Sequence, residues 1–211
     1  MKLHLGCGQR YFEGYINIDY PLSEHSVQKK SVADQLANLL ELNYADGTVE
    51  EVRLHHVFEH FSRPVTCALL SNWYSWLQPN GILHIEVPDF ERTGKAALSI
   101  FSNRKKRGVA LRHIFGSQEA HWAVHFEGHT PKSLARFISL YGFEVNKISR
   151  NSWMGTYNVE VIGRKKNNSL TKNDFLKITE NYLSDFLVDE SETENFLLET
   201  WMDIYRNHLQ K

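Results

Sequence analysis

An apolar run that ends in Gly-x-Gly opens the chain, and it restricts the possible folds more than any other feature. Lys2–Leu5 reads as a strand and is followed at once by Gly6-Cys7-Gly8. Glycine lets the backbone turn sharply and approach a ligand without an intervening side chain. In an open α/β sheet this first turn lies at the carboxyl end of a strand, where nucleotide-like ligands bind. The sequence therefore predicts an α/β fold with a ligand site at its first turn.

Short apolar runs alternate along the chain with longer segments of helical period. This alternation is the βαβ pattern of a parallel sheet. After Lys2–Leu5, the expected strands are Tyr15–Ile18, Ser31–Ala33, Val52–His55 and Ile82–Val87. Two later runs with alternating polarity, Phe143–Ile148 and Tyr157–Ile162, predict an antiparallel pair at the edge of the sheet.

Two helices have clear start and stop signals. Ser62-Arg63-Pro64 begins a helix that extends to about Leu77, because serine is a good cap and proline is tolerated in the first turn. Pro79-Asn80-Gly81 follows as a strong turn signal. Thr130-Pro131 begins the other helix, and Gly142 ends it.

The segment between these two helices is less regular. Residues 90–116 have helical character, with breaks expected at Gly94, Gly108 and Gly116. Residues 117–129 are rich in histidine and aromatic side chains and are expected to form a loop.

The polar run at residues 164–168 predicts a linker. It divides the chain into a domain of residues 1–163 and an appendage of residues 164–211. Two amphipathic helices are expected in the appendage, with apolar stripes at Phe175, Ile178, Tyr182 and Phe186 and at Leu197, Trp201 and Ile204. These stripes must be buried against the main domain, in a homodimer contact, or as a lid over a substrate.

Composition and charge exclude several classes of protein. A net charge of −1 gives no overall attraction to nucleic acid, and the basic cluster at residues 104–107 reads as a solvated surface or a small anion-binding patch. The two cysteines suggest neither a disulfide framework nor a zinc motif. No apolar stretch is long enough for a transmembrane helix or a signal peptide, so a cytoplasmic protein is expected.

Asp19 follows the second predicted strand, eleven residues after Gly8. A carboxylate there can accept hydrogen bonds from both ribose hydroxyls of an adenosine. A nicotinamide dinucleotide fold would instead need a third glycine where Tyr11 stands and an acidic residue about 20 residues further on. The spacing therefore favours a different adenosine-containing ligand.

Four segments carry a resemblance to a known family. They are LHLGCGQRYFEGYINIDYP (Leu3–Pro21), LHHVFEHF (Leu54–Phe61), LQPNGILHIEVPDF (Leu77–Phe90) and GHTPKSLARFISLYGFE (Gly128–Glu144). In this order they resemble the class I methyltransferases that depend on S-adenosylmethionine (SAM). The similarity is greatest to small bacterial members, many associated with surface-polysaccharide biosynthesis. It covers residues 1–163 and leaves the C-terminal helices outside.

The resemblance implies a Rossmann-like sheet, SAM as the cofactor and a set of cofactor-binding residues. Gly6, Cys7 and Gly8 would face the methionine and ribose of SAM, and Asp19 would bind the ribose hydroxyls. Asp34 and Gln35 would lie near the adenine, and His55 and His56 would line the pocket floor. One departure is evident, because only about nine residues separate the first two strands and a helical crossover needs a dozen or more. The first crossover must therefore be short.

Histidines cluster where the loops of an active site are expected. A hydroxyl acceptor has to lose its proton, and histidine has a suitable pKa to act as the base. The candidates are His56, at the end of its strand, and His125 or His129 on the loop before the late helix. Glu59 is a candidate to orient one of these or to bind the acceptor, and Asp89 is a candidate for an acceptor hydroxyl. A structural role remains an alternative for each of these residues.

A metal site is the weaker interpretation of the histidine-rich segment. His121, His125 and His129 recur every four residues and would share one helical face, with Glu127 nearby. Gly116 and Gly128 argue against a continuous helix there, so no metal ligands are assigned from the sequence.

The function hypothesis is SAM-dependent methylation of a small or glycan-like acceptor at an oxygen atom. The acceptor class comes only from the resemblance. The first alternative is a non-catalytic module that keeps the fold and serves as a scaffold. The second is a nicotinamide oxidoreductase, which the missing third glycine disfavours.

Overall fold

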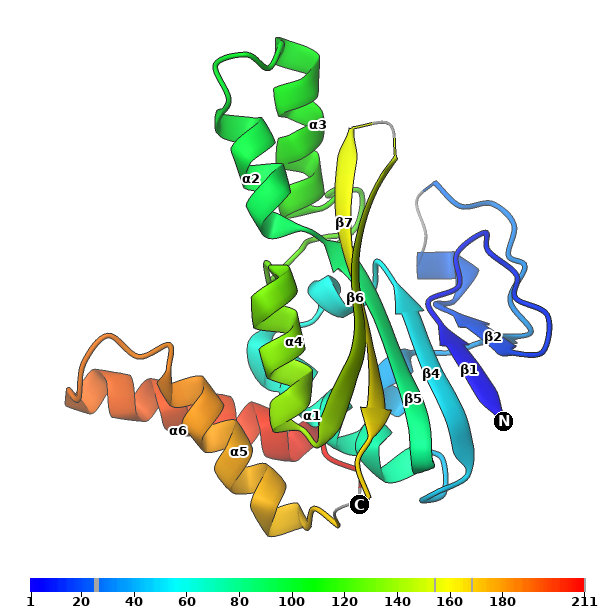
Figure 1. Ribbon diagram of the computed structural model, residues 1–211, viewed down its shortest axis with the longest axis vertical. Coiled ribbons are helices and arrows are strands. Elements are labelled where there is room, and N and C mark those ends of the chain that lie inside the picture. The colour runs from blue at the N-terminus through cyan, green and yellow to red at the C-terminus, as the bar shows by residue number, and fades with distance from the viewer. Residues whose placement is uncertain (25–26, 154, 168, 211) are drawn as a thin grey trace.

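The described residues form one seven-stranded sheet with the strand order β3-β2-β1-β4-β5-β7-β6 (Figure 1). The computed structural model describes residues 1–24, 27–153, 155–167 and 169–210. The strands are β1 (Lys2–Leu5), β2 (Ile16–Asp19), β3 (Gln35–Leu36), β4 (Val49–His55), β5 (Leu77–Pro88), β6 (Phe143–Trp153) and β7 (Thr156–Lys165). The predicted α/β fold class is confirmed.

The order of the strands creates a switch point between β1 and β4. Strands β1 to β5 are parallel, and β7 is antiparallel to both β5 and β6. From β1 the chain moves outward to β2 and β3, then returns to the other side of β1 to form β4 and β5. Ligands of open α/β sheets bind at the carboxyl ends of the strands beside such a reversal.

Six α-helices and three short 3₁₀ helices complete the described fold. They are η1 (Leu22–Glu24), η2 (Leu39–Glu41), η3 (Phe58–His60), α1 (Arg63–Trp76), α2 (Phe90–Leu98), α3 (Arg104–Phe115), α4 (Pro131–Leu140), α5 (Lys172–Ser184) and α6 (Glu192–His208). Between β1 and β2, where every residue is described, there is no helix, so the expected short first crossover is confirmed.

The expected positions of two helix breaks were wrong. Gly94 and Gly108 lie inside α2 and α3, and the interruption falls at residues 99–103. The helix starts are set by the caps: Asp89 accepts a hydrogen bond from the amide of Arg92, and Asn103 accepts one from the amide of Lys106. A glycine inside a helix costs only about 1 kcal/mol, which these caps help to offset. Gly116, with φ +85°, does end α3.

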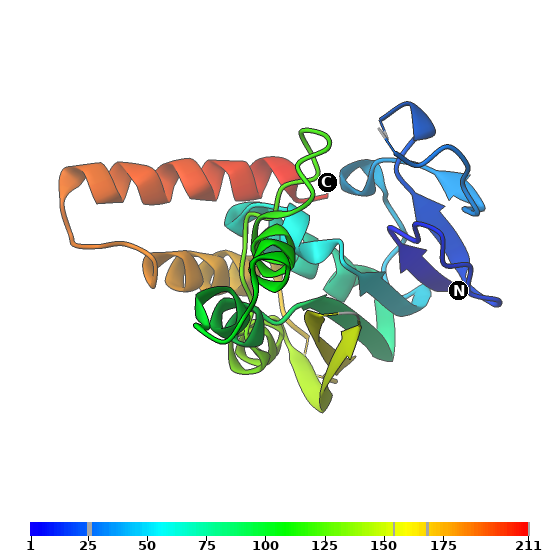
Figure 2. The ribbon, with the colours of Figure 1, turned by 90° about the horizontal axis from the view of Figure 1, so that it is seen from above.

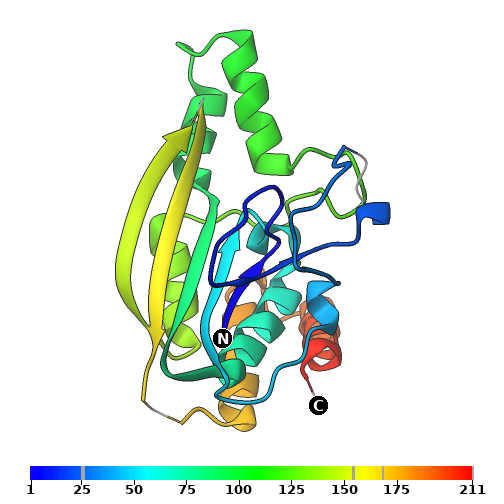
Figure 3. The same ribbon diagram turned by 90° about the vertical axis from the view of Figure 1, so that its right-hand side faces the viewer.

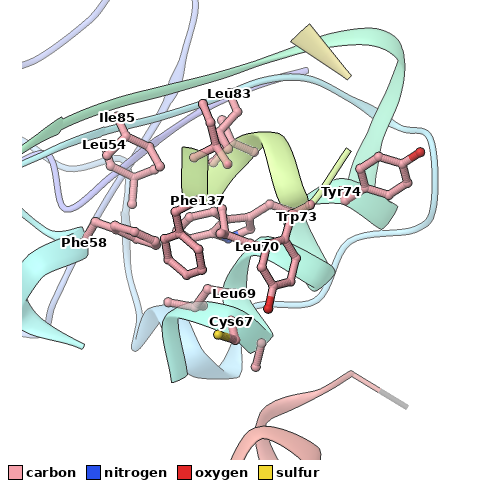
Figure 4. Packing of buried hydrophobic residues seen from close by; sticks show 14 of the residues in the cluster. Leu54, Phe58, Cys67, Leu69, Leu70, Trp73, Tyr74, Leu83, Ile85 and Phe137 are labelled. Atoms are coloured by element: carbon pink, nitrogen blue, oxygen red, sulfur yellow. The ribbon is translucent and has the colours of Figure 1, made fainter. Parts of the chain in front are cut away.

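The two faces of the sheet have opposite character. One face carries Leu3, Leu5, Val52, Leu54, Leu83, Ile85, Val159 and Val161, all fully buried. Figure 4 shows Leu54, Leu83 and Ile85 above Trp73 and Leu70 of α1 and Phe137 of α4. This apolar layer forms the core between the sheet and the helices. Figure 2 shows the backbone of the sheet and the helices from above.

The opposite face of the sheet carries charged and polar side chains in register. One row crosses three parallel strands as His4, Arg53 and His84. Next to it, Glu86 is paired with both His55 and Glu160. Successive side chains of a strand point to opposite faces of the sheet. Strands that alternate apolar and polar residues therefore form the buried apolar face and this polar layer together.

The third strand was predicted at the wrong place. The sequence suggested Ser31–Ala33, whereas β3 is Gln35–Leu36, which pairs with Ile18 and Asp19 of β2. A strand of two residues has no detectable alternation, so its position had no periodic signal in the sequence. The displacement changes which side chains follow the strand and can reach a ligand.

The C-terminal helices pack against the main domain. The hydroxyl groups of Ser71 on α1 and Tyr205 on α6 are 3.1 Å apart, and Trp76 Nε1 donates to Gln210 Oε1 at 2.6 Å. Of the predicted linker, residues 164 and 165 belong to β7, and Asn168 lies outside the described residues. In the described part of the chain, no helix combines the length and apolar character that crossing a bilayer requires.

Candidate functional site

A cavity of about 670 Å³ lies at the carboxyl ends of β1, β2 and β4, beside the switch point. Its lining includes six of the residues expected from the sequence: Gly6, Cys7, Gly8, Asp19, His55 and His56. Part of the loop of residues 117–129 closes one side, and Figure 3 shows this loop beside the segment that follows β2. Pockets for small ligands and cofactors have about this volume.

The first turn requires glycine at two positions. Gly6 has φ +65° and Gly8 has φ +55°, in the left-handed region that side chains disfavour. A Cβ on Gly6 would lie 2.2 Å from Cγ2 of Val57, whereas a Cβ on Gly8 would meet no atom within 4 Å. The turn is fixed to β2 by the Cys7 amide, which donates to the carbonyl of Ile18 at 3.0 Å. Gly6 thus allows the turn to pack closely against Val57. At Gly8, the backbone borders open space and carries no side chain that would cover it.

Asp19 presents a buried carboxylate to the cavity. Its side chain is fixed by the backbone amide of Tyr20, which donates to Oδ1 at 2.9 Å. Oδ2 accepts from Nε2 of Gln28 at 3.1 Å. Gln28 and Tyr20 also line the cavity. The backbone therefore fixes one carboxylate oxygen of Asp19. The other oxygen could exchange its hydrogen bond from Gln28 for one from a ligand.

Asn38 lines the cavity just after the third strand, where the sequence analysis had placed Asp34 and Gln35. Asn38 follows β3 and lines the cavity, and its Oδ1 accepts from the Leu40 amide at the start of η2. Asp34 and Gln35 are exposed and do not belong to the lining. Asn38 was missed from the sequence because the residue that follows the third strand could be identified only once the end of β3 was known.

His55 lies among guanidinium groups. Arg53 Nε donates to its Nε2 at 2.9 Å, and Arg10 Nη1 lies 2.9 Å from its Nδ1. Burial, together with the charges of Arg53 and Arg10, lowers the pKa of His55 to about 3 despite the attraction of Glu86. The ring is therefore neutral at physiological pH and forms an uncharged wall of the cavity.

His56 adopts a strained backbone conformation between two carboxylates. Its φ is +55°, which is uncommon for a residue other than glycine and often marks a functional position. Its Nδ1 is 3.3 Å from Glu59 Oε1, and its Nε2 is 3.5 Å from Glu86 Oε1. Burial opposes the charged ring, but these carboxylates outweigh it and raise the pKa of His56 to about 9.

Glu59 is buried directly behind His56, with a relative exposure of 1%. Burial favours its neutral form, but His56, His60 and His125 outweigh burial and lower its pKa to about 2. His125 Nε2 is 3.9 Å from Glu59 Oε1, and burial lowers the pKa of His125. His60 lines the cavity, whereas Glu59 and His125 lie behind the lining.

His129 and Asp89 lie in the protein interior, away from the cavity. His129 stacks on Phe58, with ring centroids 5.7 Å apart, and burial lowers its pKa to about 4. Asp89 is fully buried, caps α2 and forms an ion pair with Arg150 at 2.8 Å. Both side chains have the surroundings of structural residues.

The loop of residues 117–129 contacts the opposite rim of the cavity. Trp122 Nε1 donates to the carbonyl of Glu24 at 2.7 Å, and its ring lies 6.3 Å from that of Tyr20. Glu119 and His121 also line the cavity. The loop has no helix, so His121, His125 and His129 do not share a face. Glu127 instead forms an ion pair with Arg63 at 2.7 Å.

Comparison with known proteins identifies the fold. No protein-family model and no curated protein matches the sequence. Among solved structures, a SAM-dependent methyltransferase from Methanosarcina mazei is 13% identical, with a TM-score of 0.53 over 78% of this chain and 92% of the other. The Burkholderia thailandensis 1,6-didemethyltoxoflavin-N1-methyltransferase, with bound S-adenosylhomocysteine, is 14% identical, with a TM-score of 0.52 over 79% and 71%.

A third similar structure is a SAM-dependent methyltransferase from Archaeoglobus fulgidus. It is 17% identical, with a TM-score of 0.52 over 78% of this chain and 85% of the other. The chain therefore has the Rossmann-like fold of the class I SAM-dependent methyltransferases, as the resemblance predicted.

Proposed function

We propose that the protein is a SAM-dependent methyltransferase whose cofactor occupies the cavity at the switch point. One observation carries the proposal: the bare backbone of Gly8 and the buried carboxylate of Asp19 face the same cavity. The similarity of fold to methyltransferases supports the same conclusion, although at 13–17% identity it concerns the fold alone.

The residues around the cavity fit the parts of SAM. Gly6–Gly8 provide close backbone approach for the methionine portion, and Asp19 offers a carboxylate oxygen to the ribose hydroxyls. Asn38 is suited to the adenine because its amide group offers both a donor and an acceptor. The neutral ring of His55 avoids repulsion with the positive sulfonium of the cofactor.

The same turn does not suit a dinucleotide. Pyrophosphate groups bind at a helix N-terminus that follows the glycine-rich turn. Residues 9–15 are all described, and they contain no helix. The short first crossover thus removes the element that would bind a pyrophosphate.

We place the acceptor on the side of the cavity formed by His56, His60 and Trp122. Trp122 offers an indole face of the kind that stacks on sugars and other flat ligands. A small or glycan-like acceptor with a free hydroxyl is our proposal for the substrate, with oxygen as the methylated atom. The acceptor class rests on the family resemblance, and the aromatic wall supports it.

When bound, SAM would supply an electrophilic methyl group; an acceptor oxygen would bond to it in line as the bond to sulfur breaks, which releases S-adenosylhomocysteine and the hydroxyl proton. The protein's part in such a reaction is mainly positioning. The wall formed by His56 and His60 fixes the acceptor, and the Trp122 loop limits the entry of water. The C-terminal helices take no direct part, since the described cavity lining comes from residues 6–122.

Calorimetric titration with SAM, S-adenosylhomocysteine and NADH tests the proposal. Micromolar binding of the two adenosyl compounds is expected, with none for NADH. Asp19→Asn keeps the shape but removes the charge, so SAM should bind at least about tenfold more weakly, since hydrogen bonds to charged groups contribute about 1.5–3 kcal/mol. Asp46→Asn, at an exposed turn, is the matched control and should bind normally.

Two outcomes would overturn the proposal. Absence of adenosyl binding by the folded protein would remove the cofactor assignment. Tight binding of SAM without methyl transfer to any hydroxyl-bearing acceptor would instead favour the scaffold alternative.

A further inference from the structure

Three side chains of types that can bind metals lie close together beside the cavity: Glu59, His60 and His125. One ligand atom from each of the three lies within 4.8 Å of the other two. The first two residues belong to η3, directly after β4, and the third comes from the loop of residues 117–129. We propose that these three side chains bind a divalent transition-metal ion, such as Zn²⁺, next to the acceptor side of the cavity.

The carboxylate of Glu59 is the first observation that points to a ligand. Glu59 is 1% exposed, and in the described part of the chain neither of its carboxylate oxygens accepts a hydrogen bond. His56 Nδ1 forms an ion pair with Oε1 at 3.3 Å but no hydrogen bond, and among the described residues Oε2 has neither. A buried carboxylate oxygen without a hydrogen bond is costly, and a metal ion bound to the carboxylate would remove that cost.

The hydrogen bonds of the two histidines are the second observation. His60 Nδ1 lies 3.1 Å from the carbonyl oxygen of Val124, and His125 Nδ1 lies 3.1 Å from that of His113. A carbonyl oxygen only accepts, so each Nδ1 carries the proton, and in the neutral ring each Nε2 has a free lone pair. Metal-binding histidines commonly donate their second nitrogen to a backbone carbonyl in this way.

The spacing suits a small ion after minor side-chain movement. Tetrahedral ligands about 2.0–2.1 Å from Zn²⁺ are about 3.4 Å apart. His125 Nε2 and Glu59 Oε1 are 3.9 Å apart, so an inward shift of less than an ångström brings this pair to that separation. Two imidazoles and one carboxylate select zinc, cobalt, nickel or iron over magnesium or calcium, which prefer oxygen ligands alone.

The site is different from the one that histidine spacing alone suggested. His129 is buried against Phe58, and Glu127 is paired with Arg63, so neither is available to His125. Only His125 belongs to both sets. The partners of His125 come from η3, more than 60 residues earlier in the chain.

Three protein ligands leave a coordination position open. His60 lines the cavity, so we expect that position to face an acceptor oxygen bound there. An ion there would bind the acceptor oxygen and lower the pKa of its hydroxyl group, which favours loss of the proton before the oxygen attacks the methyl group. This role rests on the proposed function, whereas binding of the ion itself does not.

The test uses the full-length chain without a histidine tag, stripped with a chelator and dialysed. Zn²⁺ is titrated by calorimetry, and Co²⁺ by its visible absorption, both in the absence of SAM. One ion per chain is expected, together with a higher melting temperature in excess Zn²⁺. Glu59→Gln, His60→Ala and His125→Ala should each weaken binding at least about tenfold, because even loss of an outer-shell partner costs 10–100-fold.

His121→Ala is the matched control, since His121 is exposed on the same loop and lies outside the three-residue cluster. It should bind the ion like the wild type. Circular dichroism without metal checks that each variant is folded. If His60→Ala is not folded, His60→Asn takes its place.

The proposal is overturned if the stripped wild type binds no stoichiometric ion, if the three ligand variants bind it normally, or if His121→Ala loses it. Failure of the chain to bind SAM would remove the proposed function. It would leave this result unaffected, because the metal titration contains no SAM.

Discussion

The side-chain amide of Asn17 donates to Oδ2 of Asp34 at 3.0 Å, and the backbone amide of Asn17 donates to the same oxygen at 2.8 Å. In return, the amide of Asp34 donates to the carbonyl of Asn17. These backbone and side-chain hydrogen bonds lower the pKa of Asp34. Asp34 therefore ties the segment before β3 to β2, and its Oδ2 already accepts two hydrogen bonds within the protein.

This geometry separates the roles of Asp34 and Asn38 in an experiment. Asn38→Ser keeps a side chain that can cap η2 but is too short to reach an adenine, so SAM should bind about 2–10-fold more weakly. Asp34→Asn should lower the melting temperature and leave SAM affinity unchanged within about twofold. Calorimetry and thermal melting of both variants check the prediction. It fails if Asp34→Asn weakens SAM binding as much as Asp19→Asn does.

Local signals account for the elements that the sequence predicted well. Thr130 and Ser133 form a capping box at the start of α4, and Gly142 has the positive φ (+85°) of a helix stop. The turn at Gly6–Gly8 likewise depends on residues adjacent in the chain. Such features are encoded within a few residues, so a single sequence reveals them.

Features that depend on distant contacts could not be predicted in the same way. His60 and Val124 are hydrogen-bonded across 64 residues, and no spacing or periodicity encodes that contact. The position of β3 was missed for a related reason, because two residues show no alternation. The burial of His129 and Asp89 depends on packing. Asp89 became a candidate because it follows an apolar strand and His129 because it lies on the loop before the late helix, and neither position reveals burial.

Gly6→Ala should destabilise the protein by about 2–4 kcal/mol, because it combines an overpacking cost with a left-handed backbone cost. The added Cβ would lie 2.2 Å from Val57 Cγ2. Gly14→Ala is the control: its φ is +81°, but its Cβ would meet no atom within 4 Å, so about 1 kcal/mol is expected. Urea unfolding of both variants measures the difference.

A double mutant separates the clash from the backbone strain. Adding Val57→Ala to Gly6→Ala should recover stability relative to the sum of the single effects, with a favourable coupling of about 1 kcal/mol. Strict additivity would show that the Val57 contact does not explain the requirement for glycine.

Both thiols should be unreactive in the native protein. Burial raises the pKa of Cys7 to about 12, with further contributions from Asp19 and Asp34, and burial likewise raises the pKa of Cys67 to about 12. The thiolate is the reactive form, so labelling with Ellman's reagent at pH 8 should be at least about a hundredfold slower than in urea. Rapid labelling of one thiol in the native chain would contradict the burial of that residue.

Acid sensitivity should arise in part from Glu160 on the polar face of the sheet. Its carboxylate accepts from Ser149 Oγ and from Lys147 Nζ, and it is 2.7 Å from His84 Nε2. Burial alone would raise its pKa, but these partners outweigh burial and lower the pKa to about 2. A depressed folded-state pKa stabilises the protein above the unfolded value of about 4.3, and the contribution is lost as the pH falls toward 2.

Glu160→Gln measures this contribution directly. Because the group is partly exposed, solvent screening reduces the expected destabilisation to about 1 kcal/mol at pH 7. The difference between variant and wild type should fall by about half or more between pH 5 and pH 3, as urea unfolding at each pH would show. Glu144→Gln, an exposed position on the same hairpin, is the matched control. A difference for Glu160→Gln that stays constant down to pH 3 would show that these hydrogen bonds do not depend on the charge of the carboxylate.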